Sequence, residues 1–104
     1  MTSDVFAAIV GALGRAEVVA GRLPDGDAEG HVRRSIEEFA TAFSGREALE
    51  PAVARIRGSL DMLHGSRLAG RRRAYEHDKT LLGELDRVIE NELLPELRRM
   101  GFGV

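Results

Sequence analysis

Apolar residues recur at alternating steps of three and four along the first quarter of the chain, the spacing of one face of an α-helix. The stripe runs through Phe6, Ile9, Leu13, Ala16, Ala20 and Leu23. Val10 and Val19 widen it. A residue that precedes proline avoids the α region, so this helix should end before Pro24. The pattern predicts a first helix that carries Phe6 and Val10 on its apolar side.

Two further helices follow from the same spacing. Residues 24–30 hold three acids and two glycines, which is typical of a surface turn. A second helix from about residue 29 to 43 should face the core through Val32, Ile36, Phe39 and Phe43. The third carries Leu49, Val53, Ile56, Leu60 and Leu63. Ser44 and Glu47 have the spacing of a capping box and should begin it.

Residues 64–70 allow more than one chain path. Two glycines and a serine could form a turn there, or the third helix could continue to a turn near His77 and Asp78. Against the later turn, an apolar residue recurs every seven positions, at Leu68, Tyr75, Leu82 and Ile89. We therefore expect one long last helix from about residue 66 to 99, or ~50 Å at 1.5 Å per residue.

Several glycines and one proline interrupt these helical patterns. Pro95 should kink the last helix or leave one carbonyl near residue 91 unpaired. Gly101 should end that helix, with Phe102 folding back on the last turn. Other glycines fall inside predicted helices, where we expect them to mark tight helix crossings: Gly11, Gly14, Gly58 and Gly83.

The predicted fold class is all-α: a small antiparallel helical bundle of about four helices with a long C-terminal helix. Short connections make neighbouring helices antiparallel, and 104 residues suit a single helical domain over residues 1–104. A last helix longer than its neighbours would project apolar residues beyond them. This row of exposed apolar residues would favour self-association, since coiled-coil helices pack through apolar residues at the same three-four spacing.

Composition narrows the function classes. The chain is 43% hydrophobic and 31% charged, which indicates a globular protein rather than a disordered one. Its formal charge of −2 offers no global attraction for nucleic acid or an anionic membrane, so we expect no membrane partner. Cysteine is absent, which makes the cytoplasm the default expectation. Fourteen arginines against one lysine, Lys79, indicate the codon bias of a GC-rich, bacterial-type genome.

The densest unusual feature is a basic patch: Arg67, Arg71, Arg72, Arg73, Tyr75 and His77. Four arginines in seven residues, followed by an aromatic ring, could grip phosphate and stack on a base. The alternative is a solvated face neutralised by Glu76 and Asp78. Nucleic acid is therefore a possible partner, ranked below protein.

Four residues separate Arg72 from His77, which resembles the R-x4-H motif of HEPN-type RNases, a family of small helical bundles. The resemblance implies a dimer interface where arginine and histidine of two subunits meet, with the histidine helping to activate a ribose 2′-hydroxyl. It covers these two residues alone. Arg73 stands where the family usually has a polar residue, and Lys79 replaces a tyrosine often found two positions after the histidine.

No catalytic or metal-binding pattern is complete. Asp61 and His64 share a helical face, but a di-iron bundle needs Glu-x-x-His twice, and the sequence contains none. The serines lie outside any nucleophile-elbow context, and no phosphate loop follows a strand. We therefore expect no cofactor and no metal, and a protein that is not an enzyme.

The leading hypothesis is a non-enzymatic helical bundle that acts through protein–protein contact, as an adaptor, assembly subunit or regulator, and forms a homodimer. Its interface is expected at Leu68, Tyr75, Leu82 and Ile89, with Arg71 and Arg72 at the rim. The alternative is a nucleic-acid-binding or HEPN-like RNA-cleaving protein that uses the cluster from Arg67 to His77. A third hypothesis, a small ligand inside the bundle, requires a cavity.

Overall fold

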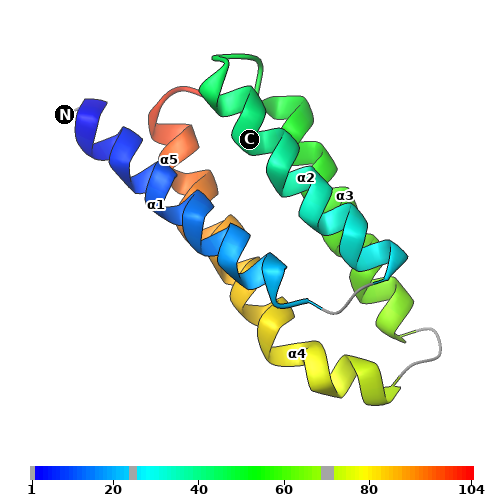
Figure 1. Cartoon of the computed structure of the whole chain (residues 1–104). Helices are drawn as coiled ribbons and strands as arrows, with labels where there is room; N and C mark the ends of the chain where they lie inside the picture. The colour runs from blue at the N-terminus through cyan, green and yellow to red at the C-terminus, as the bar shows by residue number, and fades with distance from the viewer. Residues whose placement is uncertain (1, 24–25, 69–71) are drawn as a thin grey trace.

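The protein is an antiparallel bundle of four helical columns (Figure 1). The computed structural model describes the backbone of residues 2–23, 26–68 and 72–104, and the side chains of residues 4–23, 26–65 and 80–104. The first three columns are α1 (Thr2–Gly21), α2 (Asp27–Ser44) and α3 (Glu50–Leu68). The fourth is one run of α4 (Arg72–Arg87), the π-helix η1 (Val88–Leu93) and α5 (Leu94–Arg99). The all-α bundle predicted from the sequence is confirmed.

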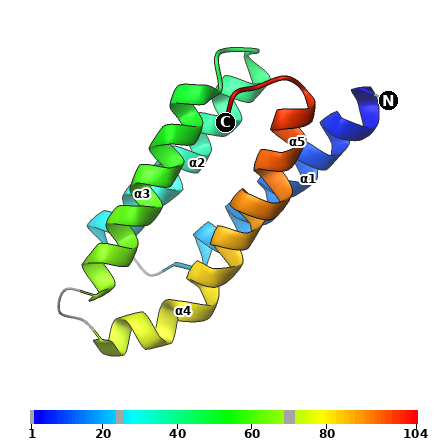
Figure 2. The same ribbon diagram turned by 180° about the vertical axis from the view of Figure 1, so that it is seen from behind.

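Each column packs against its two neighbours, so the four enclose one elongated core of about the length of a helix. α1 lies between α2 and the last run, and α3 lies between α2 and α4 on the other side. Figure 2 shows α3 beside the last run, with the two chain directions opposed. The principal extents of the bundle are 45 × 21 × 20 Å.

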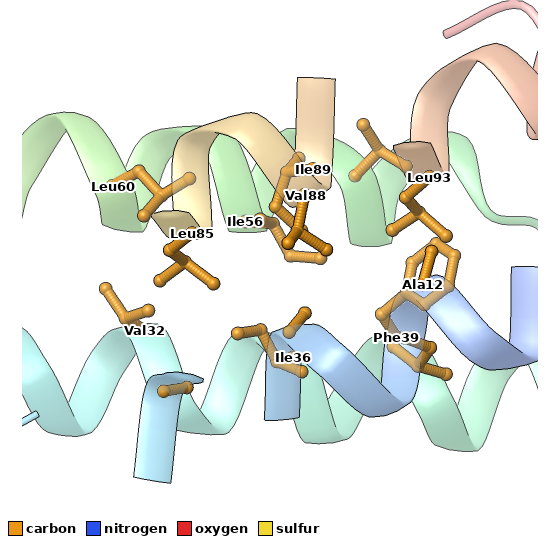
Figure 3. Packing of buried hydrophobic residues seen from close by; sticks show 14 of the residues in the cluster. Ala12, Val32, Ile36, Phe39, Ile56, Leu60, Leu85, Val88, Ile89 and Leu93 are labelled. Atoms are coloured by element: carbon orange, nitrogen blue, oxygen red, sulfur yellow. The ribbon is translucent and has the colours of Figure 1, made fainter. Parts of the chain in front are cut away.

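The predicted start of the last helix is wrong. Residues 66–68 belong to the end of α3, and the last helical run begins at Arg72 instead of residue 66. Residues 69–71 between them lie outside the described part of the chain. The reversal lets α4 and η1 return along α3, so that Leu85 comes opposite Leu60, and Ile89 lies beside Ile56 (Figure 3). The expected last helix, from about residue 66, would also have run back along α3. What differs is the place of the reversal, which follows Leu68 instead of Leu63.

The predicted stripes form most of the core. Figure 3 shows Val32, Ile36 and Phe39 of α2 facing Leu85, Val88 and Ile89 of the last run. On α1 the buried positions are Ile9, Leu13, Ala16, Val19, Ala20 and Leu23. Phe6 and Val10, which the sequence placed on the same apolar side, are exposed. Together with Val18, they give α1 three large apolar side chains that face solvent.

The loop after α2 differs from the predicted capping box. α2 extends through Ser44, and α3 begins at Glu50, so Ser44 and Glu47 do not cap a helix start. Instead the N–H of Glu47 donates to Ala42 O at 2.9 Å and that of Arg46 to Phe43 O at 3.3 Å. This is the Schellman arrangement, with Arg46 in the left-handed region at φ 56°.

The last helical run ends as predicted, at Gly101, with Phe102 folded back on the last turn. Gly101 has φ 99°, its N–H donates to Arg98 O, and the N–H of Phe102 donates to Leu97 O at 3.1 Å. Phe102 packs against the core. The expected disturbance at Pro95 takes the form of η1: the N–H of Leu94 reaches back five residues to Ile89 O. This wider turn accommodates a proline that has no N–H to donate.

Candidate functional site

The solvent side of α1 is unusual for a surface helix. Between Val5 and Gly21 the only charged residues are Arg15 and Glu17. At 3.6 residues per turn, seven uncharged residues share the side opposite the core, and none of them is buried. We name this surface the α1 outer face: Phe6, Ala7, Val10, Gly11, Gly14, Val18 and Gly21. Amphipathic surface helices normally place charged and polar residues there.

Large apolar side chains on the α1 outer face are well exposed. Val18 is 58% exposed, Phe6 53% and Val10 47%. Among the described side chains, the two other exposed large hydrophobic residues, Met62 and Met100, lie outside α1. Neighbouring exposed apolar side chains that form one patch mark contact surfaces more often than scattered ones do.

Phe6 is held in place rather than loose on the surface. Its ring stacks on Phe43 of α2, with centroids 5.3 Å apart. Phe43 in turn stacks on the buried Phe39, with centroids 6.3 Å apart. The exposed ring therefore sits at the outer end of an aromatic row that begins in the core, and contacts within the chain set its position.

The glycines of the α1 outer face are not required by packing within the chain. A Cβ at Gly14 would have no heavy atom within 4 Å apart from its own helix backbone and chain neighbours. At Gly11 the nearest would be Nη1 of Arg15 at 3.4 Å, an ordinary contact with a flexible side chain. A mid-helix glycine costs about 1 kcal/mol relative to alanine. The predicted tight crossing is therefore absent at Gly14, and also at Gly58 and Gly83, where a Cβ meets open space.

Charged residues lie on or beside the α1 outer face, since Glu17 comes seven residues, or about two turns, after Val10 and projects from the same side of the helix. Glu17 borders it on the α2 side. Arg15 borders it on the other side, where Nη2 lies 2.5 Å from Oε1 of Glu92 in η1. A groove between α1 and the last run is lined by small and apolar residues together with four charged ones: Gly11, Gly14, Val18, Val19, Val88, Arg15, Glu84, Arg87 and Glu92. The α1 outer face is thus a largely apolar strip with charges of both signs along its edges.

The predicted basic patch cannot be placed as a surface. Arg67 lies in the last turn of α3, and Arg72, Arg73, Tyr75 and His77 lie in α4. Their side chains are outside the described part of the protein, and Arg71 is outside it altogether. The R-x4-H resemblance and the nucleic-acid hypothesis rest on these residues and remain predictions.

The predicted interface is corrected where the structure describes it. Leu82 is 1% exposed and Ile89 is fully buried, so both belong to the core of the single chain. A second molecule cannot reach them in this fold. The physical reason is the reversal after α3, which turns this stripe toward α3 and α1. The side chains of Leu68 and Tyr75 lie outside the described residues.

His64 has a structural partner. Its Nε2 lies 2.9 Å from Oδ2 of Asp86, which links α3 to α4. Asp61, the residue paired with His64 in the sequence, is exposed on the same helix. Within the described residues there is no group of three or more His, Asp or Glu side chains that could hold a metal ion.

Comparisons with known proteins give no family. No family model matches the chain, and neither a curated protein sequence nor a solved structure matches it. No helix in the described parts of the chain is both long enough and apolar enough to cross a membrane. Function must therefore be inferred from the chain's own surfaces.

Sequence reasoning missed the α1 outer face. It assigned Phe6 and Val10 to the core because their spacing continues the buried stripe. The signal that could have found the face was the near absence of charge between Val5 and Gly21. A helix that is apolar all round needs cover on every side, and a four-column bundle covers α1 on one side only.

Proposed function

We propose that the protein acts through protein–protein contact, and that it self-associates as a homodimer through the α1 outer face. The observation that carries this proposal is the exposure of Phe6, Val10 and Val18 on one largely apolar side of a helix. Covering these side chains would gain roughly 25 cal/mol for each Å² of apolar surface removed from water.

A second copy of the chain fits this surface better than a strongly charged partner. The α1 outer face offers no charge for an acidic or basic partner to match. Each border carries charges of both signs, Glu17 with Arg33 on the α2 side and Arg15 with Glu92 on the other. Two copies therefore meet without bringing a single-sign field together, whichever flanks face each other. Homodimers with a two-fold axis are the commonest soluble oligomers.

Replacing Val18 by glutamate tests the proposal. Val18 is 58% exposed, so the single chain should fold normally, while a charge at the centre of an apolar interface should cost the dimer several kcal/mol. We expect Val18→Glu to be monomeric by light scattering at concentrations where the unchanged protein is dimeric, with an unchanged helical circular dichroism spectrum.

The matched control is Met62→Glu, which places the same charge on an exposed apolar side chain of α3. This variant should keep the mass of the unchanged protein. Equal masses for the unchanged protein and Val18→Glu would reject the α1 outer face as the contact surface.

A further inference from the structure

We propose that the two copies pack α1 against α1 in antiparallel orientation, with the two-fold axis passing at Gly14. This inference rests on the proposed function and adds the register and direction of the pair. It comes from the order of side chains along one ridge that runs through the α1 outer face and ends at Arg22, just beyond it.

The two valines of this ridge are placed symmetrically about Gly14. Residues four apart are neighbours on a helix surface, and from Phe6 the row reads Phe6, Val10, Gly14, Val18 and Arg22. Val10 and Val18 therefore stand at equal distances on either side of a glycine. A two-fold axis at residue 14 exchanges position i with position 28 − i, which brings Val10 of each copy onto Val18 of the other.

The glycine explains how closely the two helices can approach. When the i±4 ridges of two helices are aligned, the axes cross at about 50°, the commonest class of helix packing. The residue at the crossing point decides the distance between the axes. With Gly14 on Gly14 no side chain intervenes, and the valines on either side can close over the gap. Packing within one chain gives no reason for glycine here, since a Cβ would meet nothing within 4 Å.

The ends of the ridge are also complementary. The same two-fold axis brings Arg22 of one copy toward Phe6 of the other. Arg22 is exposed just beyond α1, and Phe6 is fixed by its stacking on Phe43. A guanidinium near an aromatic ring is attracted to it. Antiparallel α1 helices also place the negative C-terminal end of each dipole near the positive N-terminal end of the other.

Single cysteines test this arrangement directly, because the chain has no cysteine of its own. In the proposed pair, residue 10 of one copy faces residue 18 of the other. Two residues 10 are about 12 Å apart along the helix direction, from eight residues at 1.5 Å each. A disulfide needs Cα atoms within about 7 Å. We expect a mixture of Val10→Cys and Val18→Cys chains to cross-link on oxidation, and either chain alone to cross-link at least tenfold more slowly.

Met62→Cys mixed with Val10→Cys gives the rate for random collision, since Met62 lies on α3. Rapid cross-linking of Val10→Cys alone and of Val18→Cys alone would indicate a parallel pair and overturn the proposed register. Cross-linking at the Met62 background rate in all mixtures, with the unmodified protein still dimeric by light scattering, would also overturn it. A monomeric unmodified protein would instead reject the proposed function itself.

Discussion

At the residue scale, the C-terminal ends of α2 and α5 differ in how well the residue present suits the backbone conformation. Gly101 and Arg46 occupy equivalent left-handed positions in two Schellman motifs. Glycine adopts that conformation without penalty, whereas a residue with a Cβ pays roughly 1–2 kcal/mol. Arg46 is therefore a strained position that the hydrogen bonds after α2 hold in place.

Arg46→Gly should stabilise the protein. Relief of the left-handed strain exceeds the extra chain entropy of glycine, so we expect a net gain of about 1 kcal/mol and a rise in melting temperature of about 4–8 °C. Thermal unfolding followed by circular dichroism measures it. Arg46→Ala, which loses the guanidinium and keeps the Cβ, should show no comparable gain. A lower melting temperature for Arg46→Gly than for Arg46→Ala would contradict this account of the loop.

At the element scale, the helices differ in how completely the bundle uses them. α2 buries a regular stripe and exposes charged residues such as Glu37 and Glu38. η1 absorbs Pro95 by widening the turn that precedes it. Among the side chains that the structure describes, α1 is the helix that combines a buried face with a largely apolar outer face, and that asymmetry is the basis of the proposed contact.

Gly14→Ala separates the stability of a single chain from its association. Alanine has a helix propensity about 1 kcal/mol better than glycine, and the added Cβ meets open space, so the isolated chain should become more stable by up to that amount. The same Cβ should hold two α1 helices apart and weaken the dimer. Thermal unfolding at low concentration measures the first effect, and dilution followed by light scattering measures the second.

Gly58→Ala is the matched control for this prediction. Gly58 lies inside α3, is exposed, and has open space at its Cβ position as well. Gly58→Ala should stabilise the chain to a similar extent and leave association unchanged. If the two variants dissociate at the same concentration, Gly14 does not lie at the dimer contact.

The sequence predicted the helices and most of the core, because the three-four spacing of apolar residues reports directly which positions share a face. It could not locate the reversal between α3 and α4. The seven-residue repeat from Leu68 to Ile89 fits a continuous helix as well as two helices that meet at a turn. The sequence analysis also assigned Phe6 and Val10 wrongly to the core. When apolar residues lie around most of a helix, their spacing does not show which side is buried. Which side α1 buries depends on where α2 and η1 pack, and that is tertiary information.

At the scale of the whole molecule, the four columns close one core and leave the α1 outer face unused by the chain itself. Leu82 and Ile89, expected at an interface, are instead part of that core. We therefore propose self-association through the α1 outer face, on the exposure of Phe6, Val10 and Val18. Substitutions on α1, and not substitutions at Leu82 or Ile89, should therefore separate the two copies without unfolding them.

The most direct test of this account is the mass of the protein in solution, measured by light scattering over a hundredfold range of concentration. The account predicts a species of twice the 11.4 kDa chain mass, dissociating only on dilution. A mass of one chain at every concentration would contradict the account, because the α1 outer face would then remain exposed to solvent in a monomer.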